Sequence, residues 1–273
     1  MDQVGELLRH AARVAVLPLF QHLAEGDVEE KAPGELVTVA DREAERVIGA
    51  GLLELSPRSV VVGEEGVAAE PALLDRLGDA GRVWLVDPVD GTANFAAGRS
   101  PFVMMVALLE DGITRAGWIL DPLADSLVTA WRGEGAYLDG VRVRAGGQGT
   151  GRLSGVVAGK YLPEPLRFDV PRRAAALGDV LAGQHCAGKE YPAIVAGRQD
   201  YTLFWRTLPW DHAAGALFTE EAGGFVRRLD GSAYDVTDGG LGLLAAVSEP
   251  VWRQVRDALF AGELPDRGAD RVG

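Results

Sequence analysis

The residues best suited to chemistry are two aspartates close together in the first half of the chain. A short apolar run, residues 83–86, predicts a buried strand that ends at Asp87, which a proline follows, and Asp90 comes three residues later. Gly91 and Thr92 then stand at the predicted start of a helix, where backbone N–H groups lack helical partners and favour an anion. Two carboxylates beside such amides suit a divalent cation that lies between them and a phosphate.

The same residues allow a plainer interpretation. Asp87 and Asp90 could start a turn and cap a helix, which are the common roles of Asp-Pro and Asp-Gly pairs. Asp41 and Asp211 could likewise cap the helices predicted after them, and Glu64 could lie on a surface turn. Taken alone, the residue types leave both interpretations open.

Four segments in order resemble the inositol monophosphatase family of metal-dependent, lithium-sensitive phosphatases. Residues 84–95 match every fixed position of its signature W-x-x-D-P-x-D-G-T-x-N-F, and residues 63–65 match its G-E-E motif. Residues 210–215 read W-D-x-A-A-G, and a closing E-A-G-G follows at 221–224. Residues 36–41 match L-V-T-x-x-D, with Lys31 upstream, although the role of Lys31 in the pocket stays open.

The resemblance implies a carboxylate site for two or three Mg²⁺ ions. In the family scheme Glu64, Asp87 and the carbonyl of Val89 hold the first ion. Asp87 bridges to a second ion, which Asp90 and Asp211 also hold. Oxygen ligands together with a phosphate favour Mg²⁺ over softer metals.

The resemblance also assigns catalytic and phosphate-binding roles. Thr92, oriented by Asp41, and Glu64 position the attacking water. The amides of Gly91 and Thr92 hold the phosphate oxygens. No protein group needs to be phosphorylated in this scheme, so the histidines and Cys186 are expected to be spectators.

The substrate contacts implied by the family are Asp90, Ala187, Phe204 and Asp211. Two of these positions depart from the inositol pattern. Ala187 follows His185-Cys186 where the family often has a Gly-Ser/Thr-x-Ala turn, and Phe204 stands where the inositol enzymes carry a Glu. An aromatic ring cannot accept hydrogen bonds from a polyol. Inositol monophosphate, histidinol phosphate, a nucleotide 3′-phosphate and a sugar phosphate therefore all remain candidate substrates.

Bulk composition excludes several classes of protein. The 273 residues are 47% hydrophobic and 25% charged, typical of a globular protein, and carry a net charge of −13. That charge disfavours nucleic acid, and no apolar run is long enough to predict a membrane span. A single cysteine excludes an internal disulfide framework and favours a reducing compartment. We expect a cytoplasmic protein that binds a small phosphorylated metabolite.

The pattern of elements, with the resemblance, predicts an α/β fold, the layered αβαβα sandwich of the sugar and inositol phosphatases. Glycines at 145–151 suggest a boundary between an N-terminal half, residues 1–147, with most metal ligands, and an α/β half, residues 148–273. The family likeness also implies a homodimer. Predicted strands lie at 59–63, 83–86, 101–110, 113–120, 126–131, 136–140, 153–158, 201–205, 225–229 and 241–247. The first predicted helix ends at about residue 23, and the second follows a loop at 31–41. Further helices are predicted at 172–177, at 192–196, from residue 211 onward and at 250–260. A frayed tail is predicted at 266–273.

An alternative from another class is a regulatory protein that binds metal and phosphate without catalysis. The full set of carboxylates argues against it, because clustered buried charges destabilise a fold that has no use for them.

Overall fold

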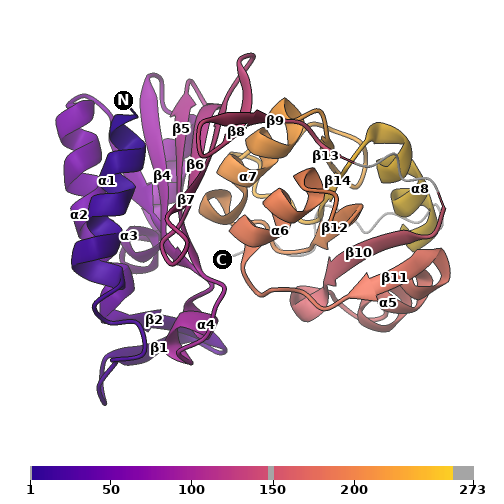
Figure 1. The fold of residues 1–273 in the computed structure, drawn as a ribbon, viewed down its shortest axis with the longest axis horizontal. Coiled ribbons are helices and arrows are strands. Elements are labelled where there is room, and N and C mark those ends of the chain that lie inside the picture. Colours follow the sequence, from indigo (N-terminus) through magenta and orange to yellow (C-terminus); the bar gives the residue numbers. More distant parts are fainter. Residues whose placement is uncertain (1, 147–150, 261–273) are drawn as a thin grey trace.

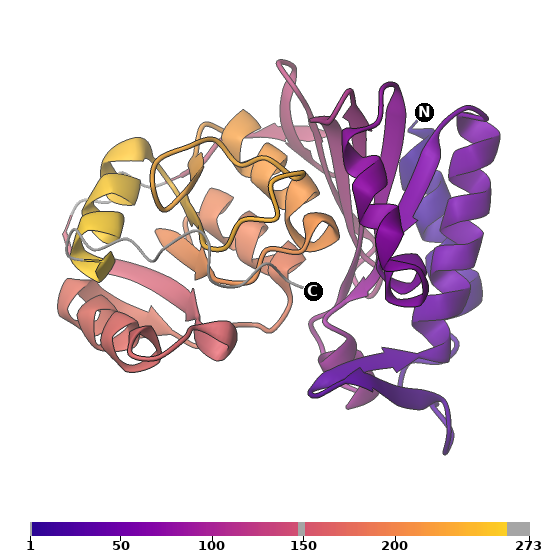
Figure 2. The ribbon, with the colours of Figure 1, turned by 180° about the vertical axis from the view of Figure 1, so that it is seen from behind.

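The computed structural model describes residues 2–146 and 151–260. Within these residues helices and sheets alternate in five layers, seen from opposite sides in Figures 1 and 2. Outer helices, a seven-stranded sheet, central helices, a five-stranded sheet and a second pair of outer helices follow one another. The predicted αβαβα sandwich is confirmed.

The seven-stranded sheet is mainly an antiparallel meander. Its strands in spatial order are β3 (Val60–Gly63), β4 (Arg82–Asp90), β5 (Val103–Glu110), β6 (Ile113–Asp121), β7 (Ser126–Trp131), β8 (Gly135–Leu138) and β9 (Val141–Val143). Only β3 and β4 run parallel. Helices α1 (Gln3–Ala11) and α2 (Val39–Leu55) cover the outer face of this sheet (Figure 1), and their apolar stripes bury Leu8, Ile48 and Leu52 against it.

The central layer consists of α6 (Ala187–Val195) and α7 (Pro209–Glu221). Small residues let these helices pack closely. A Cβ atom added at Gly215 of α7 would lie 2.0 Å from Cδ2 of Tyr191 on α6, and one added at Gly117 of β6 would lie 2.8 Å from Cα of Ala214. The glycines therefore set the spacing of α7 from both of its neighbours.

The five-stranded sheet is mixed. Its strands in spatial order are β11 (Gly178–Leu181), β10 (Leu153–Ala158), β12 (Tyr201–Phe204), β14 (Leu243–Ala246) and β13 (Phe225–Arg228). Strand β10 is parallel to β11 and β12, whereas β14 is antiparallel to β12 and β13. Helices α5 (Leu166–Leu177) and α8 (Glu249–Phe260) pack on its outer face (Figures 1 and 2).

Shorter elements complete the described fold. They are the hairpin of β1 (Val28–Ala32) and β2 (Glu35–Thr38), α3 (Glu64–Ala69), α4 (Thr92–Ala96), a π-helical turn (Ala12–Val16) and 3₁₀ turns at Pro71–Gly78 and Gly159–Tyr161.

Several predicted elements were wrong in kind or length. Residues 31–41 are not a loop, because β2 and the end of β1 pair there around Pro33-Gly34, with Gly34 at φ 74°. The strands of this hairpin are too short and polar for periodicity to reveal them. The first α-helix ends at Ala11 and continues only as a π turn, and α5 begins six residues before its predicted start. The short edge strands β9 and β11 had not been predicted.

The division between residues 147 and 148 stays a prediction, since residues 147–150 lie outside the described part of the chain. The structure does show that the seven-stranded sheet ends with β9 and that β10 opens the second sheet. The predicted tail at 266–273 also lies outside the described residues. Within residues 2–146 and 151–260, no helix has the length and apolar character needed to cross a bilayer.

Candidate functional site

A cavity of about 600 Å³ lies where the two halves meet. Strand β4, helix α4 and the β1–β2 hairpin line it from the N-terminal half, and β10, β12 and the starts of α6 and α7 line it from the other. Every residue predicted to touch metal, phosphate or leaving group lines this cavity, and these residues are Glu64, Asp87, Val89, Asp90, Gly91, Thr92, Ala187, Phe204 and Asp211.

Strand β4 delivers the two central aspartates. The prediction that this strand ends at Asp87 was wrong, because β4 continues to Asp90. Its pairing with β5 shifts register between Asp87 and Asp90, so Pro88 lies at an irregularity where no ladder hydrogen bond is required of it. The irregularity places both carboxylates on the cavity wall.

The turn after β4 depends on a glycine. Gly91 has φ 93° and precedes α4, and a Cβ there would lie 3.0 Å from the carbonyl oxygen of Pro101. Thr92 follows, with its Oγ1 2.9 Å from the carbonyl oxygen of Val89 and 3.1 Å from Oδ1 of Asp41. The structure thus brings Thr92 and Asp41 together, as the family scheme implied.

Asp41 is not the N-cap of a helix that begins after it, because α2 begins at Val39 and Asp41 lies in its first turn. Thr38 is the N-cap, and Asp41, three residues later, accepts hydrogen bonds from the Thr38 amide at 2.8 Å and from its hydroxyl at 2.5 Å. The carboxyl is fully buried. Burial raises its pKa to about 6, opposed by the Thr38 hydrogen bonds. The capping box holds Asp41 so that its other oxygen faces Thr92.

Glu64 begins α3 and contacts a lysine from the hairpin. Nζ of Lys31 lies 2.5 Å from Oε1 of Glu64 and 2.7 Å from Oε1 of Glu65. Burial raises the pKa of Glu64 to about 7, while Lys31 opposes this rise. Glu45, which the sequence had not indicated, accepts the amides of Glu65 and Gly66 at 2.8 Å each and so anchors the start of α3.

Asp87 lies at the centre of the acidic group. It is 2% exposed, and its Oδ1 has no hydrogen-bond partner among the described residues. Burial first, and then the charges of Glu64, Asp90 and Asp211, raise its pKa well above the usual range. The pKa of Asp211 is raised for the same reasons. A polar atom left unpaired among mutually repelling carboxylates fits a divalent cation, which would neutralise the repulsion and supply the missing contact.

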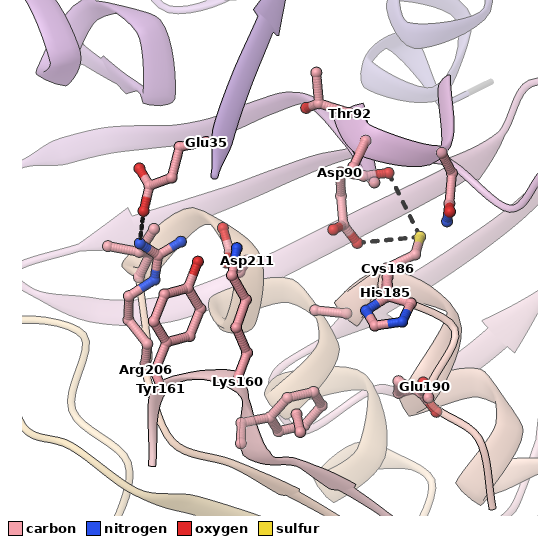
Figure 3. A pocket seen from close by; sticks show the side chains of 18 of the residues that line it. Glu35, Asp90, Thr92, Lys160, Tyr161, His185, Cys186, Glu190, Arg206 and Asp211 are labelled. Atoms are coloured by element: carbon pink, nitrogen blue, oxygen red, sulfur yellow. Dashed lines mark hydrogen bonds and ion pairs between the residues drawn. The ribbon is translucent and has the colours of Figure 1, made fainter. Parts of the chain in front are cut away.

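The side chains do not converge on one point. In the described residues, no three Asp, Glu, His or Cys side chains are grouped closely enough to hold one ion as they stand. Glu64 contacts Lys31, and Oδ2 of Asp90 accepts the Gly188 amide at 2.6 Å and lies 3.3 Å from Sγ of Cys186 (Figure 3). Oε1 of Glu64 and Oδ2 of Asp90 are thus engaged by protein groups in this arrangement.

One wall of the cavity is aromatic. Phe204 is 5% exposed and stacks on Tyr191, with ring centroids 5.1 Å apart and planes at 28°. The ring of His212 meets Phe204 at 4.7 Å, and its Nδ1 lies 2.8 Å from the Tyr191 hydroxyl. Burial lowers the pKa of His212 to about 3, so this histidine is neutral near pH 7. The wall offers an apolar face to a substrate.

Other lining residues had no predicted role. Asn94 donates to the carbonyls of Pro101 and Gln184 at 2.8 and 2.9 Å, which ties α4 to the loop before α6. Asn94 is a fixed position of the W-x-x-D-P-x-D-G-T-x-N-F signature, and no other feature of the sequence indicates a role for it. Arg206 and Tyr161 also line the cavity (Figure 3). The residues around them in the sequence did not predict which side chains they contact.

Comparison with known proteins agrees with this geometry. Residues 1–261 match the inositol monophosphatase family. An inositol-1-monophosphatase of Mesorhizobium japonicum is 36% identical over 221 residues, covering 78% of this chain and 79% of the relative. A Nus factor SuhB of Pseudomonas aeruginosa is 34% identical over 246 residues, covering 85% of this chain and 88% of the relative.

Solved structures share the fold. The extragenic suppressor protein suhB of Bartonella henselae superposes with a TM-score of 0.81 at 26% identity, covering 96% of this chain and 98% of the other. Sequence and fold thus agree over nearly the whole chain, and the signature residues meet in one cavity. The chain therefore belongs to the inositol monophosphatase family and is a phosphoric monoester hydrolase.

Proposed function

We propose that this protein hydrolyses a small phosphomonoester with Mg²⁺ and a metal-activated water, releasing inorganic phosphate. The observation that carries the proposal is the unpaired, buried Oδ1 of Asp87 among three further carboxylates, beside the amides of Gly91 and Thr92. Such a cluster repels a phosphate unless cations lie between them.

The residues that would hold the ions are those that the family scheme assigns, and all of them line the cavity. Glu64, Asp87 and the Val89 carbonyl would hold one ion, and Asp87, Asp90 and Asp211 a second. Bound Mg²⁺ would lower the pKa of a water and neutralise the charge that develops on the phosphate and the leaving oxygen. All the proposed protein ligands are oxygens, which suits Mg²⁺, and two or three ions are consistent with this donor set.

The remaining roles belong to groups that bind and orient. Asp41 accepts from the Thr92 hydroxyl, so that Thr92 and Glu64 can position the attacking water. The amides of Gly91 and Thr92 bind phosphate oxygens at the end of β4. Asp90 and Asp211, with Ala187 and Phe204, form the wall that the leaving group would meet.

The aromatic wall favours a leaving group with a flat or apolar face. Phe204 cannot accept a hydrogen bond from a ring hydroxyl, and Tyr191 and His212 behind it are engaged with one another. Inositol monophosphate, histidinol phosphate, a nucleotide 3′-phosphate and a sugar phosphate are the candidate substrates.

Phosphate release from this panel tests the proposal. We expect release that requires Mg²⁺, stops with EDTA and falls with Li⁺, and higher kcat/KM for histidinol phosphate or a 3′-nucleotide than for inositol 1-phosphate. Release that is unchanged by EDTA would contradict the metal site, and a strong preference for inositol phosphate would contradict the role given to Phe204.

A regulatory function is a second candidate because some relatives, such as that of Pseudomonas aeruginosa, carry the name Nus factor SuhB. Calorimetric Mg²⁺ binding without turnover of any phosphomonoester would favour it.

We further propose a cytoplasmic homodimer, in line with the family resemblance and the single cysteine. Light scattering would test the dimer, and cell fractionation would test the location.

A further inference from the structure

The β1–β2 hairpin is tied at its tip to the other half of the molecule. Glu35, at the start of β2, forms an ion pair with Arg206, which follows β12 in sequence (Figure 3). Beside this pair, Nζ of Lys160 donates to the carbonyl of Gly34 at 3.0 Å. Both ties join cavity-lining residues, and they connect residues 34–35 to residues more than a hundred positions away.

A second residue of the C-terminal half, Tyr161, holds the Arg206 side chain in place. Its guanidinium carbon lies 4.1 Å from the ring centroid of Tyr161, and the pair with Glu35 is partly shielded, with side chains 22% and 27% exposed. A planar guanidinium can stack on a ring and pair with a carboxylate together. Shielding makes such a pair stronger than a fully exposed one.

The hairpin that Arg206 restrains also carries two contacts of the proposed site. Lys31 on β1 contacts Glu64 and Glu65. Strand β2 ends at Thr38, whose amide and hydroxyl bind Asp41, and Asp41 in turn contacts Thr92. Ala32 pairs with Glu35 across the hairpin, and Lys31, the residue before Ala32, lies at the register shift between Glu30 and Ala32.

We infer that Arg206 is a positioning residue that acts through Glu35 and the hairpin to hold Lys31 against Glu64 and Glu65, and Thr38 against Asp41. This inference rests on the proposed function, because its effect on turnover assumes that Glu64, Asp41 and Thr92 work on a phosphomonoester. Arg206 also lines the cavity, so the rival possibility is a direct contact with the leaving group.

Four variants separate these possibilities. Glu35→Gln and Arg206→Gln each remove one charge, the double variant removes both, and Glu35→Arg with Arg206→Glu exchanges them. The matched control is Arg42→Gln, which breaks an ion pair between Arg42 and Glu29 of the same hairpin without reaching the other half. Turnover is measured at saturating Mg²⁺, and hydrogen exchange is followed at amides 28–38.

We expect each single variant to lower kcat about fivefold to tenfold, roughly 1 to 1.4 kcal/mol, with KM within about twofold. The double variant should lose no more than either single variant, and the charge exchange should recover part of the loss, since the groups act as one pair. Amides 28–38 should exchange faster in both single variants and at the wild-type rate in Arg42→Gln.

The opposite pattern overturns the inference. If Arg206→Gln raises KM while Glu35→Gln leaves both kcat and hairpin exchange unchanged, Arg206 contacts substrate and does not act through the hairpin. If the wild-type protein releases no phosphate, the proposed function fails. Hairpin exchange in the variants then still decides whether Arg206 holds the hairpin, and unchanged exchange refutes that role.

Discussion

Replacement of Asp87 by Asn should have opposite effects with and without metal. The side chain is 2% exposed, one of its oxygens has no hydrogen-bond partner among the described residues, and burial and four neighbouring carboxylates raise its pKa. A carboxyl whose folded-state pKa lies above its unfolded value destabilises the fold at any pH above the unfolded value. Asn has nearly the same shape and no charge, so the metal-free fold should gain stability at pH 8.

The size of the gain follows from the cost of an unsatisfied buried group, about 1–3 kcal/mol. For a domain of this size each kcal/mol shifts Tm by about 2–4 °C, so in EDTA the variant should melt roughly 2–12 °C above wild type. Ligand at a hundred times its Kd stabilises a fold by about 2.7 kcal/mol. Mg²⁺ should therefore stabilise the wild-type fold by about this amount. The variant should lose most of this stabilisation, because it lacks the Asp87 carboxylate that would bind the ions.

Activity should fall far more than stability changes. Loss of a carboxylate that would bind both proposed ions should lower kcat/KM by at least about 10³-fold, or ~4 kcal/mol of transition-state stabilisation. Thermal melts in EDTA and in Mg²⁺, with phosphate release, measure both effects, and Asp257→Asn on the exposed side of α8 is the matched control. A variant that melts below wild type in EDTA, or keeps normal turnover, would refute the view that repelling carboxylates meet here to bind metal.

Three other substitutions test the site and the packing beneath it. Thr92→Ala should lower kcat about 10²-fold by removing the hydroxyl, while Thr92→Ser should keep most activity; equal kinetics for the two would contradict the role of the hydroxyl. Gly215→Ala should cost about 1–3 kcal/mol or more in urea unfolding because its Cβ would overlap Tyr191, whereas Gly78→Ala, with open space around it, should be near neutral. Asn94→Ala should remove two hydrogen bonds between α4 and the loop before α6 and lower kcat/KM about tenfold, and unchanged phosphate kinetics would show that the loop is held by other contacts.

Local patterns were enough to predict much of the fold. The strands of the meander are apolar, follow one another and pair with sequence neighbours, so their order needed no distant information. The exceptions are short edge strands such as β9 and β11 and the polar β1–β2 hairpin, whose pairing depends on neighbours rather than on their own residue types. The extension of β4 to Asp90 was also missed, because Pro88 is tolerated only at the register shift that pairing with β5 creates.

The sequence by itself determined which residues could do the chemistry, since Asp87, Asp90, Gly91 and Thr92 are nearly contiguous and their roles depend on one turn. Only the tertiary structure decided what surrounds them. Lys31 meets Glu64 across 33 residues, and Arg206 meets Glu35 across 171. Ion pairs of this kind depend on how whole layers pack, and a charged side chain carries no local signal of its distant partner. The layers therefore determine the charge around the carboxylates and the shape of the leaving-group wall.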